Sequence, residues 1–447
     1  MSNNANKKDE ESVEFLNNSE REDEAVDFDD VETDEIFQWD TFNYSIRGSV
    51  TNTDIESMIN ALGDGTCTVP GFQRRFVWTK DQVSRLAFSI IKGIPVPPIY
   101  VYFDEDEGNE VILDGQLRMT ALFLYFYGIY FQRENKRKKI NFKDICSKMA
   151  EKRKLDEEIS NESARDKKKE LIERKKSILD YLKTSYEIVE TEYYVKDNSG
   201  NKHDITFEHF KEKEKRYLKR KSLQYAVVEC AEGDSPQTFY TMVFKMLNSA
   251  GKNLGRQEVR NGLYWKTKLY RGLFEINEDE SLSWRQIYGR LSLYSKDVEL
   301  LLKMLALNYY TRLNVVNQLE RIDIIYSGTF NWGNIMNEYS QKASCWSDEE
   351  VAEELQKLRS FFERIDIDSD PSLCRKATLE AVFVCMNKLR LIGDCTNVNE
   401  QISLSWLNEL SQDKNIFGDG KVLSNKDSVQ TRITETLPKV KLKYEKH

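Results

Sequence analysis

The sequence predicts an α+β protein, in which a mixed N-terminal domain carries a charged helical insertion and a mainly α-helical C-terminal domain follows. Three observations predict this class. A β-branched and aromatic stretch at 99–103, an acidic turn and a short stretch at 110–113 indicate a β-hairpin. Residues 133–183 hold eighteen Lys and Arg against eleven Asp and Glu, which is typical of solvated helix. From 266 to about 437, apolar residues recur at helical spacing.

The N-terminal domain is expected at 41–265 and begins with helix signals. A short helix is expected at 54–62, ending at Gly63. Thr79 and Gln82 form a capping box ahead of a helix that ends at Gly93. After the hairpin, the apolar residues 119–130 predict a buried helix. The dipeptide Asp114-Gly115 therefore stands at a junction between strand and helix.

Residues 132–222 are expected to be an insertion, because their charged composition interrupts the domain. Most of 133–183 is expected to form long helix with i,i+4 ion pairs. The domain resumes with a strand at 225–230, a helix opened by Ser235-Pro236 and a helix at 257–265. Residues 266–447 form the C-terminal domain, with helices such as 298–310 and 377–391.

The net charge of −9 is unevenly distributed. Residues 1–40 carry fifteen carboxylates and three basic side chains, a net charge of −12, which leaves the other 407 residues at +3. We expect 1–40 to be a disordered acidic tail. No stretch approaches the roughly 20 apolar residues of a membrane span. Seven cysteines without a Cys-x-x-Cys pair are typical of reduced thiols in a cytoplasmic protein.

The residue types available exclude several enzyme classes. Only three histidines occur, His203, His209 and His447, too few for a Ser-His-Asp triad, a His/Cys zinc site and a histidine-based nuclease to be expected. The sequence contains no G-x-x-x-x-G-K-[ST] phosphate loop and no G-x-G-x-x-G motif. A P-loop NTPase and a Rossmann dehydrogenase are therefore not expected.

Three clusters of polar residues stand beside apolar segments. They are Gln73-Arg74 with the aromatic residues after it, Asp114-Gly115-Gln116-Leu117-Arg118, and Asn248-Ser249-Ala250-Gly251 followed by Glu258 and Arg260. In the second cluster, a helix N-terminus favours an anion, Gly115 permits close approach of a phosphate and Arg118 adds a cation. The alternative is an ordinary turn in which Asp114 caps the helix and Arg118 is surface charge. On this pattern alone the turn is favoured.

The chain resembles the GmrSD-type restriction endonuclease N-terminal domain family, whose signature is Asp-Gly-Gln-Gln-Arg (DGQQR) and whose core is similar to the ParB/sulfiredoxin fold. The matching segments are VPGFQRRFVWTKDQVSRLAFSIIKGIPVPPIYVY, VILDGQLRMTALFLY and FYTMVFKMLNSAGKNLGRQEVRNGLYW. They occur in the family's order and span about 45–265. This resemblance reverses the preference at Asp114-Gly115 and favours a binding site.

The resemblance implies a nucleotide-binding, often NTP-hydrolysing domain of bacterial defence against phage or modified DNA. By motif match, Asp114 and Gln116 are the expected catalytic residues, and Asp114 also the expected Mg²⁺ ligand. The expected nucleotide-binding residues are Gln73, Arg74, Gly115 and Arg118. The residues expected to support the site are Asn248, Gly251, Glu258 and Arg260.

Two departures from the family pattern affect the predicted activity. Leu117 stands where the family has its second glutamine, so an amide that could position water is missing and hydrolysis is affected more than binding. Many relatives carry a C-terminal His-based nuclease domain. Residues 266–447 contain no His-x-x-Pro or His-Asn-His motif, so such a domain is not expected there. A cleaving system would then need a separate nuclease or ATPase subunit.

The sequence therefore predicts a cytoplasmic, nucleotide-dependent defence protein that acts on or senses DNA, with an NTP and Mg²⁺ as its ligands. The alternative is a non-enzymatic DNA-binding or adaptor protein with a degenerate nucleotide pocket, which the basic insertion and Leu117 favour. A third hypothesis is a DNA mimic acting through the acidic residues 1–40.

Overall fold

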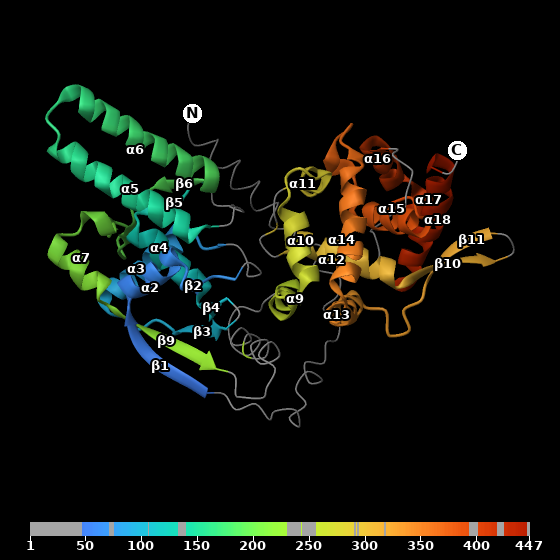
Figure 1. Cartoon of the computed structure of the whole chain (residues 1–447), viewed down its shortest axis with the longest axis horizontal. Helices are drawn as coiled ribbons and strands as arrows, with labels where there is room; N and C mark the ends of the chain where they lie inside the picture. Colours follow the sequence, from blue (N-terminus) through green and yellow to red (C-terminus); the bar gives the residue numbers. More distant parts are fainter. Residues whose placement is uncertain are drawn as a thin grey trace. The chain divides into compact units, whose positions relative to one another are not determined.

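The computed structural model describes the parts of the chain that Figure 1 shows as coloured helices, strands and loops. The described residues are 47–70, 76–105, 107–132, 140–229, 243, 256–289, 292, 295–316, 319–392, 401–417 and 424–444. The predicted acidic tail at 1–40 and the helix predicted to start at Ser235-Pro236 lie outside them, apart from residue 243.

A five-stranded mixed sheet organises the region between residues 47 and 229. Its strands are β1 (Arg47–Asp54), β2 (Cys67–Thr68), β3 (Ile99–Asp104), β4 (Asn109–Asp114) and β9 (Ser222–Glu229), in the order β1-β9-β3-β4-β2. β3 and β4 form the predicted antiparallel hairpin. β9 pairs antiparallel with β1 and parallel with β3. The chain therefore leaves this sheet after β4 and returns to its interior with β9.

Three helices accompany the sheet: α2 (Ile55–Asp64), α3 (Lys80–Lys92) and α4 (Gln116–Phe126). The capping box of α3 is confirmed, with Thr79 Oγ1 accepting from the Gln82 N–H at 3.3 Å and Gln82 Oε1 accepting from the Thr79 N–H at 2.8 Å. The predicted end of α2 at Gly63 is wrong. The helix continues to Asp64 with Gly65 as its C-cap, and Gly63 lies inside it, where a Cβ would lie 2.5 Å from Cys146 Sγ.

The predicted helix over 119–130 is too long at its C-terminal end. α4 stops at Phe126, Gly128 takes a left-handed φ of +62°, and the chain continues as β5 (Ile129–Phe131). β5 is antiparallel to β6 (Ile188–Glu190), which lies far along the chain. A short apolar run fits a buried helix and a buried strand equally well, and only this distant partner decides between them.

The charged segment forms two helices that pack side by side, α5 (Phe142–Asn161) and α6 (Arg165–Tyr186) (Figure 1). The remainder of the predicted insertion is not helical throughout. It contains β6, β7 (Tyr194–Lys196), β8 (Lys202–Asp204), the 3-10 turn η3 (Phe207–His209) and α7 (Glu212–Lys219). β7 and β8 form a separate hairpin, and β6 pairs with β5.

The region after residue 255 is mainly helical, as predicted. Its helices are α9 (Arg256–Tyr264), α10 (Lys268–Glu278), α11 (Ser283–Tyr288), α12 (Lys296–Tyr309), α13 (Trp332–Ala343), α14 (Asp348–Glu363), α15 (Lys376–Lys388), α16 (Leu404–Gln412), α17 (Lys414–Phe417) and α18 (Lys426–Tyr444). Two short pairings interrupt them: the hairpin of β10 (Thr311–Val316) with β11 (Leu319–Ile324), and β12 (Ile365–Asp366) with β13 (Ile402–Ser403).

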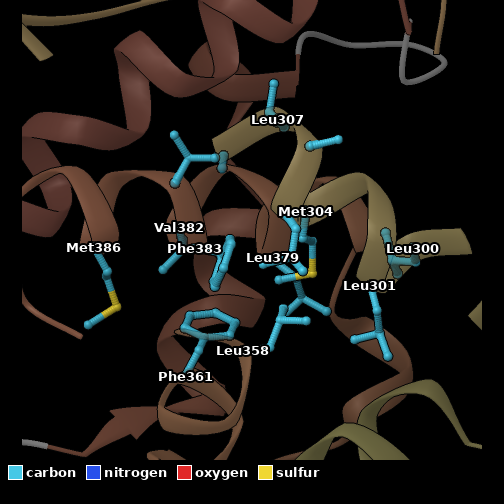
Figure 2. Close-up of a cluster of buried hydrophobic side chains, with 14 of the residues drawn as sticks. Leu300, Leu301, Met304, Leu307, Leu358, Phe361, Leu379, Val382, Phe383 and Met386 are labelled. Carbon is cyan, nitrogen blue, oxygen red and sulfur yellow. The ribbon is translucent and has the colours of Figure 1, made fainter. Parts of the chain in front are cut away.

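Most of the buried apolar side chains among the described residues belong to two clusters. One extends from Ile55 to Tyr225, and the other from Leu269 to Tyr444. Figure 2 shows the second cluster, in which side chains from α12, α14 and α15 meet, among them Met304, Phe361 and Phe383, all fully buried. Burying a large apolar side chain contributes about 1.5–3 kcal/mol, so each cluster supports its own set of elements.

No helix in the described part of the chain combines the length and the apolar character that crossing a membrane requires.

Candidate functional site

The turn between β4 and α4 brings the Asp-Gly corner to the start of a buried helix. Asp114 ends β4 opposite Tyr100 of β3. Gly115 has a φ of +94°, and a Cβ at this position would lie 2.5 Å from Ile99 Cδ1. A side chain is therefore excluded twice, by backbone conformation and by the packing of β3. The chain makes a tight turn here that strongly favours glycine.

The side chain of Arg118 folds back over this turn. Arg118 Nη2 donates to Asp114 Oδ2 at 2.6 Å, across one helical turn. The same nitrogen lies 3.2 Å from the Cβ position of Gly115. The side chain of Arg118 is 14% exposed and that of Asp114 is 33% exposed. Asp114 therefore holds the guanidinium at the first turn of α4 instead of leaving it extended into solvent.

The N-terminus of α4 has the electrostatics of an anion site. Gly115 occupies the N-cap position and offers no side chain to the first N–H groups, and the first helical bond runs from the Met119 N–H to the Gly115 carbonyl. The positive end of the helix dipole and the Arg118 guanidinium thus meet at one point. Leu117, the departure from the family motif, is 9% exposed and packs inward. The arrangement can bind an anionic group such as a phosphate.

The turn supplies few ligands for a metal ion. Asp114 offers one carboxylate, which already accepts from Arg118. Among the described residues, no group of three or more His, Cys, Asp or Glu side chains is arranged to hold a metal. Mg²⁺ is commonly held by one or two carboxylates together with substrate phosphates, so Asp114 is compatible with an ion that arrives with a nucleotide. The Mg²⁺ assignment to Asp114 stays a prediction.

Four of the predicted site residues cannot be placed. Gln73, Arg74, Asn248 and Gly251 lie outside the described residues. Their roles stay predictions.

The structure places Glu258 and Arg260 on α9, which packs against α12 and α13. Arg260 is 2% exposed, and it donates to Gln257 Oε1 at 2.8 Å and pairs with Glu299 of α12 at 2.8 Å. Its Nη1 also donates to Asn337 of α13 at 3.4 Å. These contacts tie the third motif to the helical region, so its described contacts are structural.

A cavity of about 1130 Å³ lies elsewhere, past the C-terminal end of α4. Tyr127 and Gly128, which follow that end, contribute to its wall together with residues of α5, η3 and α7. Glu208 links two of its cations, pairing with Arg153 at 3.5 Å and with Lys215 at 3.1 Å. No sequence pattern indicates this cavity, because the prediction for 132–222 is a charged insertion in which most of 133–183 is solvated helix.

Ion pairs set the electrostatics of the cavity wall. Burial alone would lower the pKa of Lys152, but its hydrogen bonds to Glu190 and Asp156 outweigh burial and raise that pKa above its ordinary value. A hydrogen bond to Asp204 raises the pKa of His209. His203 bonds a different carboxylate, that of Asp197, at 2.9 Å. The two histidines therefore each have an aspartate partner.

Comparison with known families finds a match, and it covers this part of the chain. Residues 55–265 match the family described as GmrSD restriction endonuclease, N-terminal domain. The match contains the whole β4–α4 turn and extends through α9. No curated protein and no solved structure matches the chain. The ParB/sulfiredoxin-like description of the core therefore stays a prediction.

Proposed function

We propose, from the premise that residues 55–265 belong to the GmrSD restriction endonuclease N-terminal domain family, that this protein is a nucleotide-binding restriction-type defence protein acting on DNA. The family supports the restriction-type role and the DNA target. We further propose that the protein binds a nucleotide, whose phosphates lie at the N-terminus of α4. The defence reaction then uses a separate effector subunit, a nuclease or an ATPase, in the cytoplasm.

One observation carries the nucleotide proposal: the Arg118 guanidinium is folded back onto the start of a helix that has no side-chain cap. The Arg118 side chain is only 14% exposed and bonds Asp114, so its charge is held beside the positive end of the α4 dipole. A phosphate at the same place would receive N–H groups from the helix and a charged hydrogen bond from Arg118. The turn thus collects the groups that phosphate recognition uses.

Each residue of the motif then has a distinct role. Gly115 keeps the turn open to a phosphate, and Arg118 neutralises its charge. Asp114 positions Arg118 and supplies one oxygen to a Mg²⁺ ion bound with the nucleotide. Gln116, the first residue of α4, orients a phosphate oxygen or the attacking water. Gln73 and Arg74 complete the pocket in this proposal.

Calorimetric titration of the full chain with ATP, GTP and CTP, each with Mg²⁺, tests the proposal. We expect one of them to bind, and Arg118→Ala to weaken that binding about 10- to 100-fold, because a hydrogen bond to a charged group contributes about 1.5–3 kcal/mol. Arg85→Ala is the matched control: Arg85 pairs with Asp81 at the same i,i+4 spacing and the same 2.6 Å. An Arg118→Ala protein that binds as tightly as the Arg85→Ala protein would contradict the assignment.

Hydrolysis is a separate step with its own measurement. Release of inorganic phosphate by the purified protein with Mg²⁺ is compared with release by Asp114→Ala. Release above that variant supports an NTPase. Equal rates, together with intact nucleotide binding, support the second candidate, a non-enzymatic DNA-binding or adaptor protein. The inward-packed Leu117 favours this second candidate, since it replaces the amide that would hold water.

A further inference from the structure

The charges of α6 are sorted onto two different faces of the helix. With about 100° of rotation per residue, residues 165, 169, 176 and 183 fall within about 40° of one another. All four are cations, Arg165, Lys169, Lys176 and Lys183, and we call them the cationic stripe. The four acidic residues of α6 fall on the neighbouring arc. They are Asp166, Glu170, Glu173 and Asp180.

The cationic stripe faces solvent. All four of its side chains are exposed. The buried residues Leu171, Ile178 and Leu182 lie on the roughly opposite side of α6, where the helix packs against α5 and β6. Figure 1 shows α6 beside α5. The stripe is therefore the outward face of this helical pair.

Two other cations of α6 have carboxylate partners within the chain. Lys175 pairs with Asp156 of α5 at 2.6 Å, and Lys167 pairs with Glu162 at 3.0 Å. Within the described residues, no ion pair joins a member of the cationic stripe to a carboxylate. The four cations of the stripe are therefore available to an external anion, whereas Lys167 and Lys175 pair with carboxylates of the chain itself.

From these observations we infer that the cationic stripe of α6 binds the phosphate backbone of double-stranded DNA. The inference rests on the proposed function for its choice of DNA among polyanions. The stripe is about 27 Å long at 1.5 Å per residue, about four-fifths of the roughly 34 Å turn of a duplex, and its lysines repeat about every 10.5 Å. Four flexible or forked cations in a row suit contacts to phosphates, which position a protein without reading sequence.

Two neighbouring features give the surface an orientation. The acidic arc of α6 repels phosphates, so the duplex is confined to one side of the helix. Ile172 lies among the stripe residues and is 49% exposed, which gives an apolar contact for deoxyribose between two phosphate contacts. The duplex is therefore expected to contact α6 from the side of the cationic stripe.

Fluorescence anisotropy with a labelled DNA duplex, measured over about 50–200 mM salt, tests the inference. The test variant carries Lys169→Gln, Lys176→Gln and Lys183→Gln in the full chain. Each lost phosphate contact lowers the slope of log K against log salt by about 0.9, so we expect the slope to fall by nearly 3 and the affinity to fall at least tenfold at ~0.1 M salt. Circular dichroism and thermal melting check that the variant is folded.

The matched control removes the same charge elsewhere. Lys196, Lys213 and Lys426 are exposed lysines of β7, α7 and α18. We expect the variant in which all three are Gln to keep the wild-type slope of log K against log salt to within about 0.9, the value of one phosphate contact. An equal loss in both variants would overturn the inference, because net charge alone would then explain binding. Absence of DNA binding by the wild-type chain, or displacement by duplex RNA at lower concentration than by duplex DNA, would overturn it as well.

Nucleotide titration of the same proteins separates this inference from the proposed function. The stripe variant is expected to bind nucleotide like the wild type, and Arg118→Ala is expected to lose nucleotide while keeping its salt-dependent DNA affinity. If the stripe variant binds nucleotide and keeps the wild-type slope of log K for DNA against log salt, the DNA-binding role of the stripe is overturned and the nucleotide site is not. Unchanged nucleotide affinity in Arg118→Ala overturns the proposed nucleotide site alone.

Discussion

The starts of α3 and α4 resemble each other in sequence and differ in construction. An Asp and an Arg at i,i+4 with a 2.6 Å contact stand at the start of each helix. Asp81 and Arg85 both lie in α3, whereas Asp114 is the last residue of β4 and Arg118 lies in the first turn of α4. In α3 the two side chains are 58% and 76% exposed, and Thr79 and Gln82 complete a capping box. At the start of α4 they are 33% and 14% exposed, and the N-cap is a glycine.

This difference separates two ways of building a helix start around an Asp–Arg pair. The sequence around α3 satisfies the orphan N–H groups of the helix with its own side chains. The start of α4 lacks such a cap and instead places a half-buried guanidinium beside the turn. A helix start of the second kind gains from an external anion, and the first kind does not. The two starts therefore provide internal controls for each other.

The largest expected effect tests whether the turn before α4 requires glycine. Gly115→Ala places a Cβ 2.5 Å from Ile99 Cδ1 at a φ of +94°. Left-handed backbone costs about 1–2 kcal/mol for a residue with a Cβ. Overpacking costs about 1–3 kcal/mol more, so we expect the free energy of unfolding to fall by roughly 2–5 kcal/mol in urea denaturation.

Gly65→Ala is the control for this change. Gly65 has a φ of +87° and ends α2, but a Cβ there would meet nothing within 4 Å. Only the backbone cost of about 1–2 kcal/mol remains. Equal losses in the two variants would mean that the contact with Ile99 does not matter and that the turn before α4 has no special constraint.

A smaller effect tests the cap of α3. Thr79→Ala removes the hydroxyl that accepts from the Gln82 N–H. Loss of such a cap costs about 1 kcal/mol, which a shift of the denaturation midpoint measures. Thr79→Ser keeps the hydroxyl and is expected to retain most of that stability. Nucleotide affinity should stay at the wild-type value in both, and a drop in affinity would place the start of α3 in the binding site.

The smallest effect is expected at the exposed pair of α3. Arg85→Ala breaks the contact with Asp81, and exposed i,i+4 pairs contribute about 0.3–0.5 kcal/mol. High salt should remove most of even this difference, because it screens exposed charges. A loss above about 1 kcal/mol would show that exposure does not separate the two Asp–Arg pairs in energy, which would weaken the contrast with Arg118.

The features of this protein that depend on local interactions could be predicted from the sequence. The capping box at Thr79, the stop at Gly93 and the hairpin of β3 and β4 each depend on residues close in the chain, and all are confirmed. The helical class of the C-terminal region follows from apolar periodicity and is also confirmed. The Asp-Gly corner could be located in the same way, because turn residues act on their immediate neighbours.

Features that depend on distant partners could not be predicted. β5 is a strand because Ile188–Glu190 pairs with it, and the close approach of Cys146 to Gly63 joins α5 to α2. The cavity beside Tyr127 requires α5, η3 and α7 to converge, and no local pattern indicates that convergence.

The sequence by itself determined the α+β class, the motif at Asp114–Arg118 and the family resemblance that the 55–265 match supports. Only the tertiary structure decided that Arg118 folds back over Gly115, that Arg260 contacts α12 and α13, and that four cations of α6 share one outward face. The reason is physical. Backbone propensity and capping act within a few residues, whereas burial and ion pairing depend on which surfaces the whole chain brings together.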